Sequence, residues 1–149
     1  MRTAFGLSAL LAALVVVPLG AHAEPPNTAS RTPVPLVFFD IAGPASAKLD
    51  AFYAGVFGWS IDAGGRIGPK STGGLDGALR QDPPGKILYL GVPDVTAALN
   101  DVVKAGGKIV QPRFVVPGVV VLGLFTDPAG NPMGLVEMKD GKPVVPPSP

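Results

Sequence analysis

One pattern of secondary-structure signals occurs twice in the chain. Two segments, beginning LVFFD and ILYLG, each read as a strand, a turn, a helix, a glycine stop and the start of another strand. Gly58 and Gly107, which follow the two helices, are 107 − 58 = 49 positions apart. Self-similarity at a fixed spacing is the signature of repeated structural units. The repeat therefore predicts a single fold built from two equivalent modules.

Both helices are predicted from apolar residues whose spacing puts them on one helix face. Leu49, Phe52, Tyr53 and Val56 stand at i, i+3, i+4 and i+7 in the first helix, and Ala98, Leu99, Val102 and Val103 stand at i, i+1, i+4 and i+5 in the second. Three strands joined by turns follow the second helix, and short strands are expected near 59–62 and 74–80 after the first. The aromatic residues around the first helix are expected in the core rather than in a ligand-binding box; they are Phe52, Tyr53, Phe57 and Trp59.

Residues 1–23 have the pattern of a secretory signal peptide. Arg2 precedes an apolar run from Ala4 to Val17, and Ala21-His22-Ala23 supplies a cleavage site. The run is short for a membrane span, which needs about 20 apolar residues. We therefore expect cleavage after Ala23, a periplasmic or secreted protein, and no membrane attachment of the mature chain.

Cleavage would leave a chain without histidine, because His22 is the only histidine, and the sequence has no cysteine. Zinc and copper sites built on imidazole or thiolate, and cysteine or Ser-His-Asp nucleophiles, are then excluded. Losing Arg2 from the 12 basic residues leaves 11, which balance the 11 acidic ones. A net charge near zero gives no reason to expect nucleic acid as a partner.

The mature chain divides by composition. Residues 24–33 are rich in Pro, Thr, Ser and Asn and read as a linker, and the folded domain is expected at 34–140. Its two modules would cover about 34–82 and 83–140. Residues 141–149 form a proline-rich tail that is expected to be extended and mobile.

Three stretches resemble the vicinal oxygen chelate superfamily, namely FYAGVFGW, GVPDVTAALNDVVKAGGKIV and FTDPAGNPMGLVE. This superfamily includes glyoxalase I, extradiol dioxygenases, and fosfomycin- and bleomycin-resistance proteins. The resemblance spans about residues 34–138 and implies an α+β fold. Two tandem βαβββ modules would form a curled mixed sheet around a cavity, with the helices outside. Members often pair modules across a dimer, so a homodimer is possible.

The resemblance also indicates where metal ligands would stand. In metal-dependent members these positions carry His and Glu, and here they hold Phe38, Ile87 and Gly134. A fourth position aligns loosely with Asp76. The usual ligands are therefore replaced at three of the four positions.

Strand alternation carries the cavity hypothesis further. Phe38 and Asp40 are two residues apart, so they share one face of the first strand. By the same alternation, Tyr89 is expected on the cavity-facing side of its own strand, and Val136 on the same side as Gly134. We expect these five residues to bind a ligand, with Gly134 leaving room where a carboxylate would otherwise stand. Phe38 and Tyr89 are expected to approach from opposite halves of the pocket, so that a flat ligand stacks between their rings. Alternatively, the two rings simply fill the space.

Asp40 and Glu137 are two carboxylates that are expected to have different surroundings. Asp40 would be costly to bury without a partner, so we expect Arg80, Arg113 or water beside it, and only a small stability change in Asp40→Asn. Glu137 lies three residues after Gly134, and side chains an odd number of residues apart on a strand point to opposite faces. Glu137 should therefore face the helices or solvent, unless a β-bulge shifts the register.

Three interpretations of function follow. The preferred one is an exported, metal-free protein of the glyoxalase/bleomycin-resistance type that binds a small molecule and needs no cofactor. The alternative is an enzyme, a glyoxalase-like lyase or isomerase or an oxygenase, with a divalent metal held by Asp40, Asp76 and Glu137. A third is a domain that acts only through protein contacts. Whether the chain catalyses a reaction stays open at this stage.

Overall fold

The computed structural model describes residues 32–149. The expected signal peptide and almost all of the linker lie outside the described residues. Residues 33–149 cluster as one compact unit. No helix in this described part is long and apolar enough to cross a membrane.

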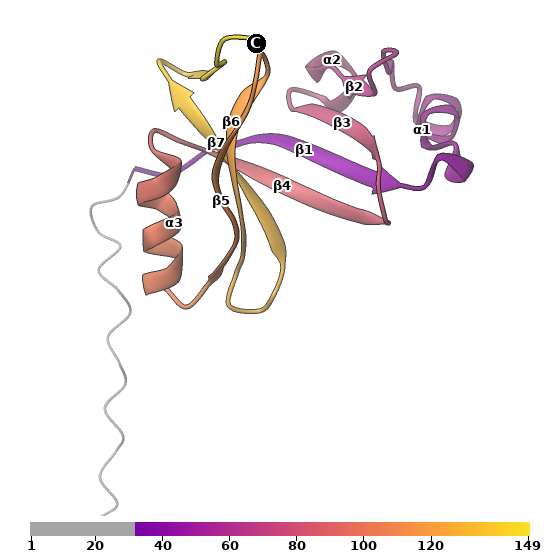
Figure 1. Cartoon of the computed structure of the whole chain (residues 1–149). Helices are drawn as coiled ribbons and strands as arrows, with labels where there is room; N and C mark the ends of the chain where they lie inside the picture. The colour runs from indigo at the N-terminus through magenta and orange to yellow at the C-terminus, as the bar shows by residue number, and fades with distance from the viewer. Residues whose placement is uncertain (1–31) are drawn as a thin grey trace, which may run out of the picture. The chain divides into compact units, whose positions relative to one another are not determined.

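An eight-stranded mixed sheet organises the domain, with β1 (Leu36–Gly43) and β4 (Gly85–Val92) paired antiparallel at its centre (Figure 1). Each central strand has a parallel neighbour, β3 (Asp76–Gln81) beside β1 and β7 (Pro132–Lys139) beside β4. The remaining strands are β2 (Arg66–Ile67), β5 (Lys108–Val116), β6 (Val120–Thr126) and β8 (Lys142–Pro143). The order is β2-β3-β1-β4-β7-β6-β5, with β8 on β7. The predicted α+β class and mixed sheet are confirmed.

The register reproduces the repeat seen in the sequence. Asp40 on β1 pairs with Ala78 on β3, and Tyr89 on β4 pairs with Gly134 on β7. Asp40 and Tyr89 are 89 − 40 = 49 residues apart. The two strand pairs are therefore equivalent, and the centre of the sheet is the junction of the two modules.

The second module has a complete core. Helix α3 (Val95–Lys104) begins at Asp94, whose side chain accepts a hydrogen bond from the Ala97 N–H at 2.9 Å, as an N-cap should. The helix packs on the sheet through a buried cluster of Val92, Val95, Leu99, Phe125 and Leu135. Gly123 permits this close approach, because an added Cβ would lie 2.6 Å from Val95 Cγ1.

The first module is incomplete. After α1 (Leu49–Phe57), the strand expected near 59–62 is reduced to one bridge, Ile61 to Ile67, while the strand expected near 74–80 is present as β3. A short helix that the sequence analysis missed, α2 (Pro69–Thr72), begins with a proline and ends at Gly73 in the left-handed region. Only the second module thus has all three strands after its helix.

Helix α1 has no buried residue, so the expectation that its aromatic residues form core is wrong. Phe52, Val56 and Phe57 are 52%, 60% and 58% exposed. The rings pack mainly on one another, and Tyr53 stacks on Trp59 with centroids 5.0 Å apart. The missing strand explains this difference, because the sheet of the first module is too narrow to cover the helix.

Residues 141–149 are not a free tail. Asp140 (φ 51°) and Gly141 (φ 74°) form a two-residue turn of the kind that joins hairpin strands. The chain then returns along β7, where the Val144 N–H donates to the Glu137 carbonyl at 2.8 Å. The expectation of a mobile tail overlooked this Asp-Gly turn signal.

Candidate functional site

The face of the sheet opposite α3 holds a cavity of about 330 Å³. Four of the five predicted site residues line it: Phe38, Asp40, Tyr89 and Val136. The other lining residues are Val37, Arg66, Asp76, Arg80, Val116, Val119, Val120, Leu122 and Pro143. One wall is therefore apolar, and the charged side chains gather at the β1–β3 end.

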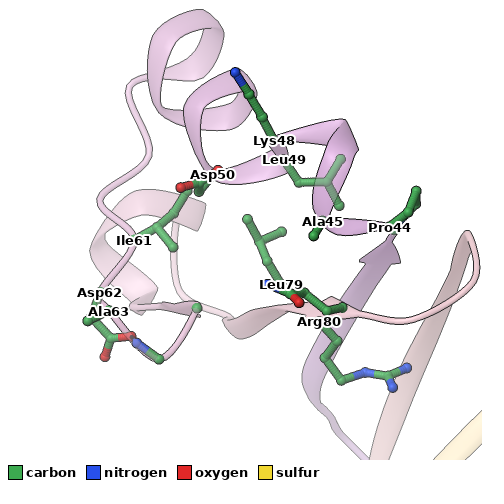
Figure 2. A pocket seen from close by; sticks show the side chains of 14 residues that line it. Pro44, Ala45, Lys48, Leu49, Asp50, Ile61, Asp62, Ala63, Leu79 and Arg80 are labelled. Atoms are coloured by element: carbon green, nitrogen blue, oxygen red, sulfur yellow. Dashed lines mark hydrogen bonds between the residues drawn. The ribbon is translucent and has the colours of Figure 1, made fainter.

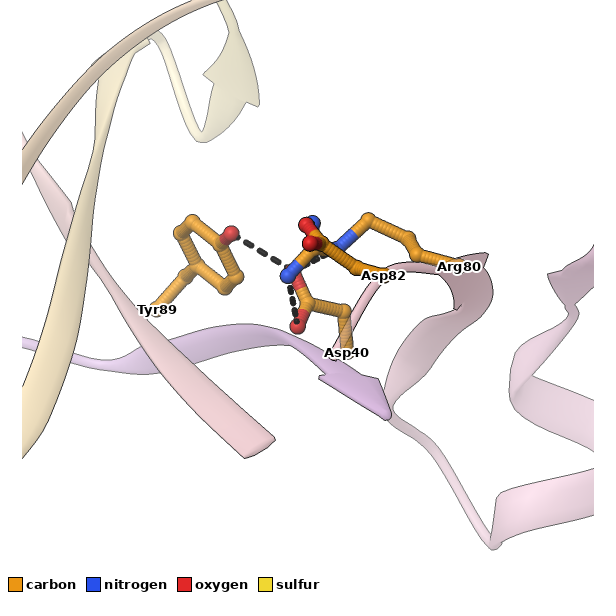
Figure 3. A network of polar contacts seen from close by, with 4 residues as sticks. All are labelled: Asp40, Arg80, Asp82 and Tyr89. Atoms are coloured by element: carbon orange, nitrogen blue, oxygen red, sulfur yellow. Dashed lines mark hydrogen bonds and ion pairs between the residues drawn. The ribbon is translucent and has the colours of Figure 1, made fainter. Parts of the chain in front are cut away.

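Asp40 is the centre of the polar end. It is 2% exposed, and both carboxylate oxygens are occupied. The Tyr89 hydroxyl donates to Oδ2 at 2.6 Å, Arg80 Nη2 donates to Oδ1 at 3.0 Å, and Arg80 Nε lies 2.9 Å from Oδ2 (Figure 3). The predicted partner Arg80 is confirmed, whereas Arg113 pairs elsewhere. With its charge satisfied in this way, Asp40 is not a free anion for a cationic ligand.

The contacts with Asp40 also determine the protonation states of Tyr89 and Arg80. Burial, reinforced by the hydrogen bond to Asp40, raises the pKa of Tyr89 well above its usual value. The hydrogen bond to Asp40 likewise raises the pKa of Arg80. Near neutral pH, Tyr89 is therefore a neutral donor and Arg80 a cation, and neither is poised to exchange a proton.

Tyr89 also explains the glycine at position 134. A Cβ added to Gly134 would lie 2.1 Å from Tyr89 Cδ1 and 2.3 Å from Cε1. The tyrosine ring stands over this glycine, so the expectation that Gly134 leaves room for a ligand is wrong, and Gly134 does not line the cavity. Glycine is required here because the ring needs the space that a side chain would take.

The expected stacking of a flat ligand between two rings is also wrong. Phe38 and Tyr89 are direct cross-strand partners on β1 and β4. Their ring centroids are 5.7 Å apart and the rings meet edge to face at 70°. An edge-to-face contact at this distance leaves no slot between the rings. A ligand would contact their outer surfaces instead.

The strand register shows which residue stands at the fourth metal-ligand position, which the sequence analysis aligned loosely with Asp76. Ala78, which pairs with Asp40, is the equivalent of Gly134, which pairs with Tyr89; Asp76 pairs with Phe38 instead. The four equivalent positions are therefore Phe38, Ala78, Ile87 and Gly134, and none has a metal-binding side chain.

The carboxylates proposed for the alternative site do not converge. Asp40 is bound to Arg80 and Tyr89, while Glu137 is bound to Arg113 near the start of α3. Within residues 32–149, no group of three or more His, Cys, Asp or Glu side chains could hold a metal ion. The residues present do not fit the metal of the metal-dependent members.

Glu137 has a structural role. Arg113 donates to it twice at 2.8 Å, and the Val95 N–H at the start of α3 lies 3.5 Å from Glu137 Oε2. The prediction that Glu137 faces the helices or solvent is confirmed, since its side chain lies beside the start of α3. The hydrogen bonds from Arg113 lower the pKa of Glu137.

The lowered pKa of Glu137 gives a pH-dependent stability. A carboxyl whose pKa is depressed by folding stabilises the fold above its unfolded pKa, and this contribution is lost as the pH falls through its folded pKa. We expect Glu137→Gln to unfold at lower urea concentration than wild type at pH 7, with the difference shrinking as the pH is lowered through the acidic range. Urea titrations across this range measure the effect. A gap that persists at low pH would contradict the ion-pair explanation.

Sequence reasoning missed several cavity residues. Arg66 reaches the polar end from β2, and Val116, Val119 and Val120 come from the β5–β6 hairpin. Val120 and Leu122 alternate on β6, and that period-two pattern was a usable signal. Nothing in the sequence placed the two-residue strand β2.

A second, larger hollow of about 730 Å³ lies between α1, the loop at 61–65 and β3 (Figure 2). Leu49, Ile61 and Leu79 project toward it, and Lys48 and Asp50 lie around it. None of the five predicted site residues lines this hollow. It occupies the space that a helix-to-sheet core fills in the second module, and it follows from the missing strand.

Known proteins resemble the chain at low identity. No family model matches. Proteins named "Putative glyoxylase CFP32" from Mycobacterium bovis and Mycobacterium tuberculosis are 31% identical over 99 residues, covering 56% of this chain. The chain spans only 38% of the length of these relatives.

Solved structures share the fold. Methylmalonyl-CoA epimerase from Mycobacterium tuberculosis is 16% identical with a TM-score of 0.51, over 68% of this chain and 85% of that one. A hypothetical protein from Bacillus halodurans is 14% identical with a TM-score of 0.51, over 76% and 100%. The two-module sheet and these likenesses define a glyoxalase-like fold. The chain thus has the fold seen in the vicinal oxygen chelate superfamily.

Proposed function

We propose that this chain binds a small molecule in the 330 Å³ cavity without a metal ion. The observation that carries the proposal is the Asp40–Arg80–Tyr89 network beside an apolar wall. An ordinary small-molecule pocket has mostly apolar walls and a few polar groups in fixed positions. In this cavity the polar groups are held by one another, so the site is ordered before any ligand arrives.

The charges point to the polar group of the ligand. Asp40 is neutralised, and Arg80 keeps N–H groups beyond those bound to Asp40 and Asp82. Among residues 32–149 no ion pair involves Arg66, which lies at the same end of the cavity. Apart from the neutralised Asp40, the cavity is lined by two guanidinium groups and one carboxylate, that of Asp76. This excess of positive charge favours an apolar ligand with one anionic group.

A second candidate is an enzyme with a divalent metal, either a glyoxalase-like lyase or isomerase or an oxygenase. The name of the mycobacterial relatives, a putative glyoxylase, favours the first of these. The four ligand positions argue against it here. Phe, Ala, Ile and Gly supply no donor atoms from their side chains, and Asp40 cannot leave Arg80 and Tyr89 without unpairing a buried charge. A pocket of the drug-binding, bleomycin-resistance kind fits these residues better.

Two fluorescent probes test both the site and its charge preference. 1-Anilinonaphthalene-8-sulfonate is anionic, and N-phenyl-1-naphthylamine is its neutral counterpart without the sulfonate. We expect both to bind wild type, and Arg66→Gln to weaken the anionic probe by about fivefold, the scale of an exposed charge pair. The neutral probe should bind Arg66→Gln as it binds wild type.

A matched pair of substitutions locates the binding. Leu122 lines the cavity, whereas Leu88 is 43% exposed and lies outside it. Leu122→Trp should fill the cavity and weaken both probes by about tenfold or more, because overpacking leaves no room for them. Leu88→Trp adds the same ring without filling the cavity. Equal affinities in the two variants would mean that the probes bind elsewhere, for example on the exposed rings of α1.

Export belongs to the same proposal and is supported by the signal-peptide pattern of residues 1–23. A periplasmic or secreted protein without cysteine would meet its ligand outside the reducing cytoplasm, with stability drawn from packing alone. Intact-mass measurement of the protein recovered from the periplasm or medium should give a chain that begins at Glu24. A chain that retains Arg2 would refute cleavage.

A further inference from the structure

We infer that residues 142–148, here named the strap, form a movable wall that controls access to the cavity. The inference rests on the proposed binding function of that cavity. Pro143 lines the cavity together with Val116, Val119 and Val120 of the β5–β6 hairpin. Residues of the strap and of the hairpin thus border the same cavity.

The strap connects these two borders. It leaves β7 at the Asp140-Gly141 turn, where Met138 pairs with Pro143. Farther along, the Gly118 N–H at the tip of the β5–β6 hairpin donates to the Pro146 carbonyl at 3.0 Å. In Figure 1 the C-terminus accordingly lies beside the tip of this hairpin. The strap therefore spans from β7 to the hairpin that carries the apolar wall.

The strap is held more weakly than the sheet beneath it. Its three prolines, Pro143, Pro146 and Pro147, have no N–H to donate. Pro143, Val145 and Ser148 are exposed, and Val145 is 60% exposed. Segments with few buried contacts open without unfolding the domain. Release of the Gly118 and Val144 contacts would separate the strap from the hairpin and widen the opening.

The chain offers a direct way to fix the strap. A Cβ built on Gly118 would lie 3.5 Å from the Ser148 Cβ, within the Cβ–Cβ range of disulfides. The sequence has no cysteine, so Gly118→Cys with Ser148→Cys would form a single, unambiguous crosslink. The φ of +69° at Gly118 strains any other residue. The reduced double variant carries the same strain and is the matched control.

Stopped-flow mixing with N-phenyl-1-naphthylamine gives the association and dissociation rates. We expect the oxidised variant to bind and release the probe at least tenfold more slowly than its reduced form, since entry would need the strap to open. Equal rates in the two forms, with the probe bound in the cavity, would overturn the strap inference and leave the proposed function intact.

A measurement without ligand separates the two proposals if no probe binds. Val136 lines the cavity and is 4% exposed. Val136→Cys should react with a small maleimide much faster in a chain ending at Gly141 than in the full chain. Equal labelling rates would refute the strap as a wall. Faster labelling of the truncated chain would support the strap as a wall. This result would stand even if no probe binds and the proposed binding function is refuted.

Discussion

Gly134→Ala is expected to destabilise the domain by about 1–3 kcal/mol, the range of overpacking in a well-packed interior. The new methyl group would stand 2.1 Å from the Tyr89 ring. The ring cannot simply turn away, because its hydroxyl is bound to Asp40 at 2.6 Å and its edge contacts Phe38. The substitution would therefore strain β7 or break the Asp40–Tyr89 hydrogen bond.

Urea denaturation of Gly134→Ala measures this loss, and Gly55→Ala provides the control. Gly55 lies inside α1 with no atom within 4 Å of an added Cβ. Alanine in such an exposed helical position should stabilise the protein by about 0.5–1 kcal/mol. The two glycine replacements are thus expected to act in opposite directions. A Gly134→Ala protein as stable as wild type would mean that Tyr89 is not fixed over the glycine.

Asp40→Asn is expected to cost about 2–4 kcal/mol, because it leaves the Arg80 guanidinium without its main partner and weakens the Tyr89 hydrogen bond. The cost stays below that of a fully buried pair because the Arg80 side chain is 40% exposed. This expectation reverses the sequence-based one, which foresaw a nearly unchanged melting temperature. The reversal follows from the 2% exposure of Asp40 and its three contacts to Arg80 and Tyr89.

Asp82→Asn is the matched control in the same network. Asp82 contacts Arg80 Nη1 at 2.9 Å, but both side chains are substantially exposed, at 49% and 40%. Exposed pairs contribute about 0.2–1 kcal/mol, so this variant should remain close to wild type. A double-mutant cycle of Asp40→Asn with Tyr89→Phe would then give the coupling between the two side chains. Similar stabilities for Asp40→Asn and Asp82→Asn would show that Asp40 is not the centre of the network.

Strand alternation and the repeat were sufficient to predict one face of the site. The period of two placed Phe38 and Asp40 together on β1, and it gave Tyr89 the cavity-facing parity of its own strand. These features are local, so a sequence carries them directly. The prediction of Arg80 as a partner of Asp40 needed only charge and burial.

The remaining features depend on contacts that local patterns do not encode. The family resemblance aligned the fourth ligand position loosely with Asp76, whereas the register makes Ala78 the equivalent of Gly134. The apolar face of α1 was read correctly as a pattern, but the missing strand leaves it uncovered. Tyr89 on β4 packs over Gly134 on β7, so this contact depends on how the two strands pair. It could be found only once the register was known.

Metal content is the most direct test of the central proposal, that the cavity of this glyoxalase-like fold works without a metal ion. Native protein, purified without chelators and dialysed, would be analysed for divalent metals and titrated with N-phenyl-1-naphthylamine in the presence and absence of a chelator. The account predicts metal far below one equivalent per chain and the same probe affinity in both buffers. One equivalent of tightly held metal that is lost in Asp40→Asn, together with probe binding that the chelator abolishes, would contradict it.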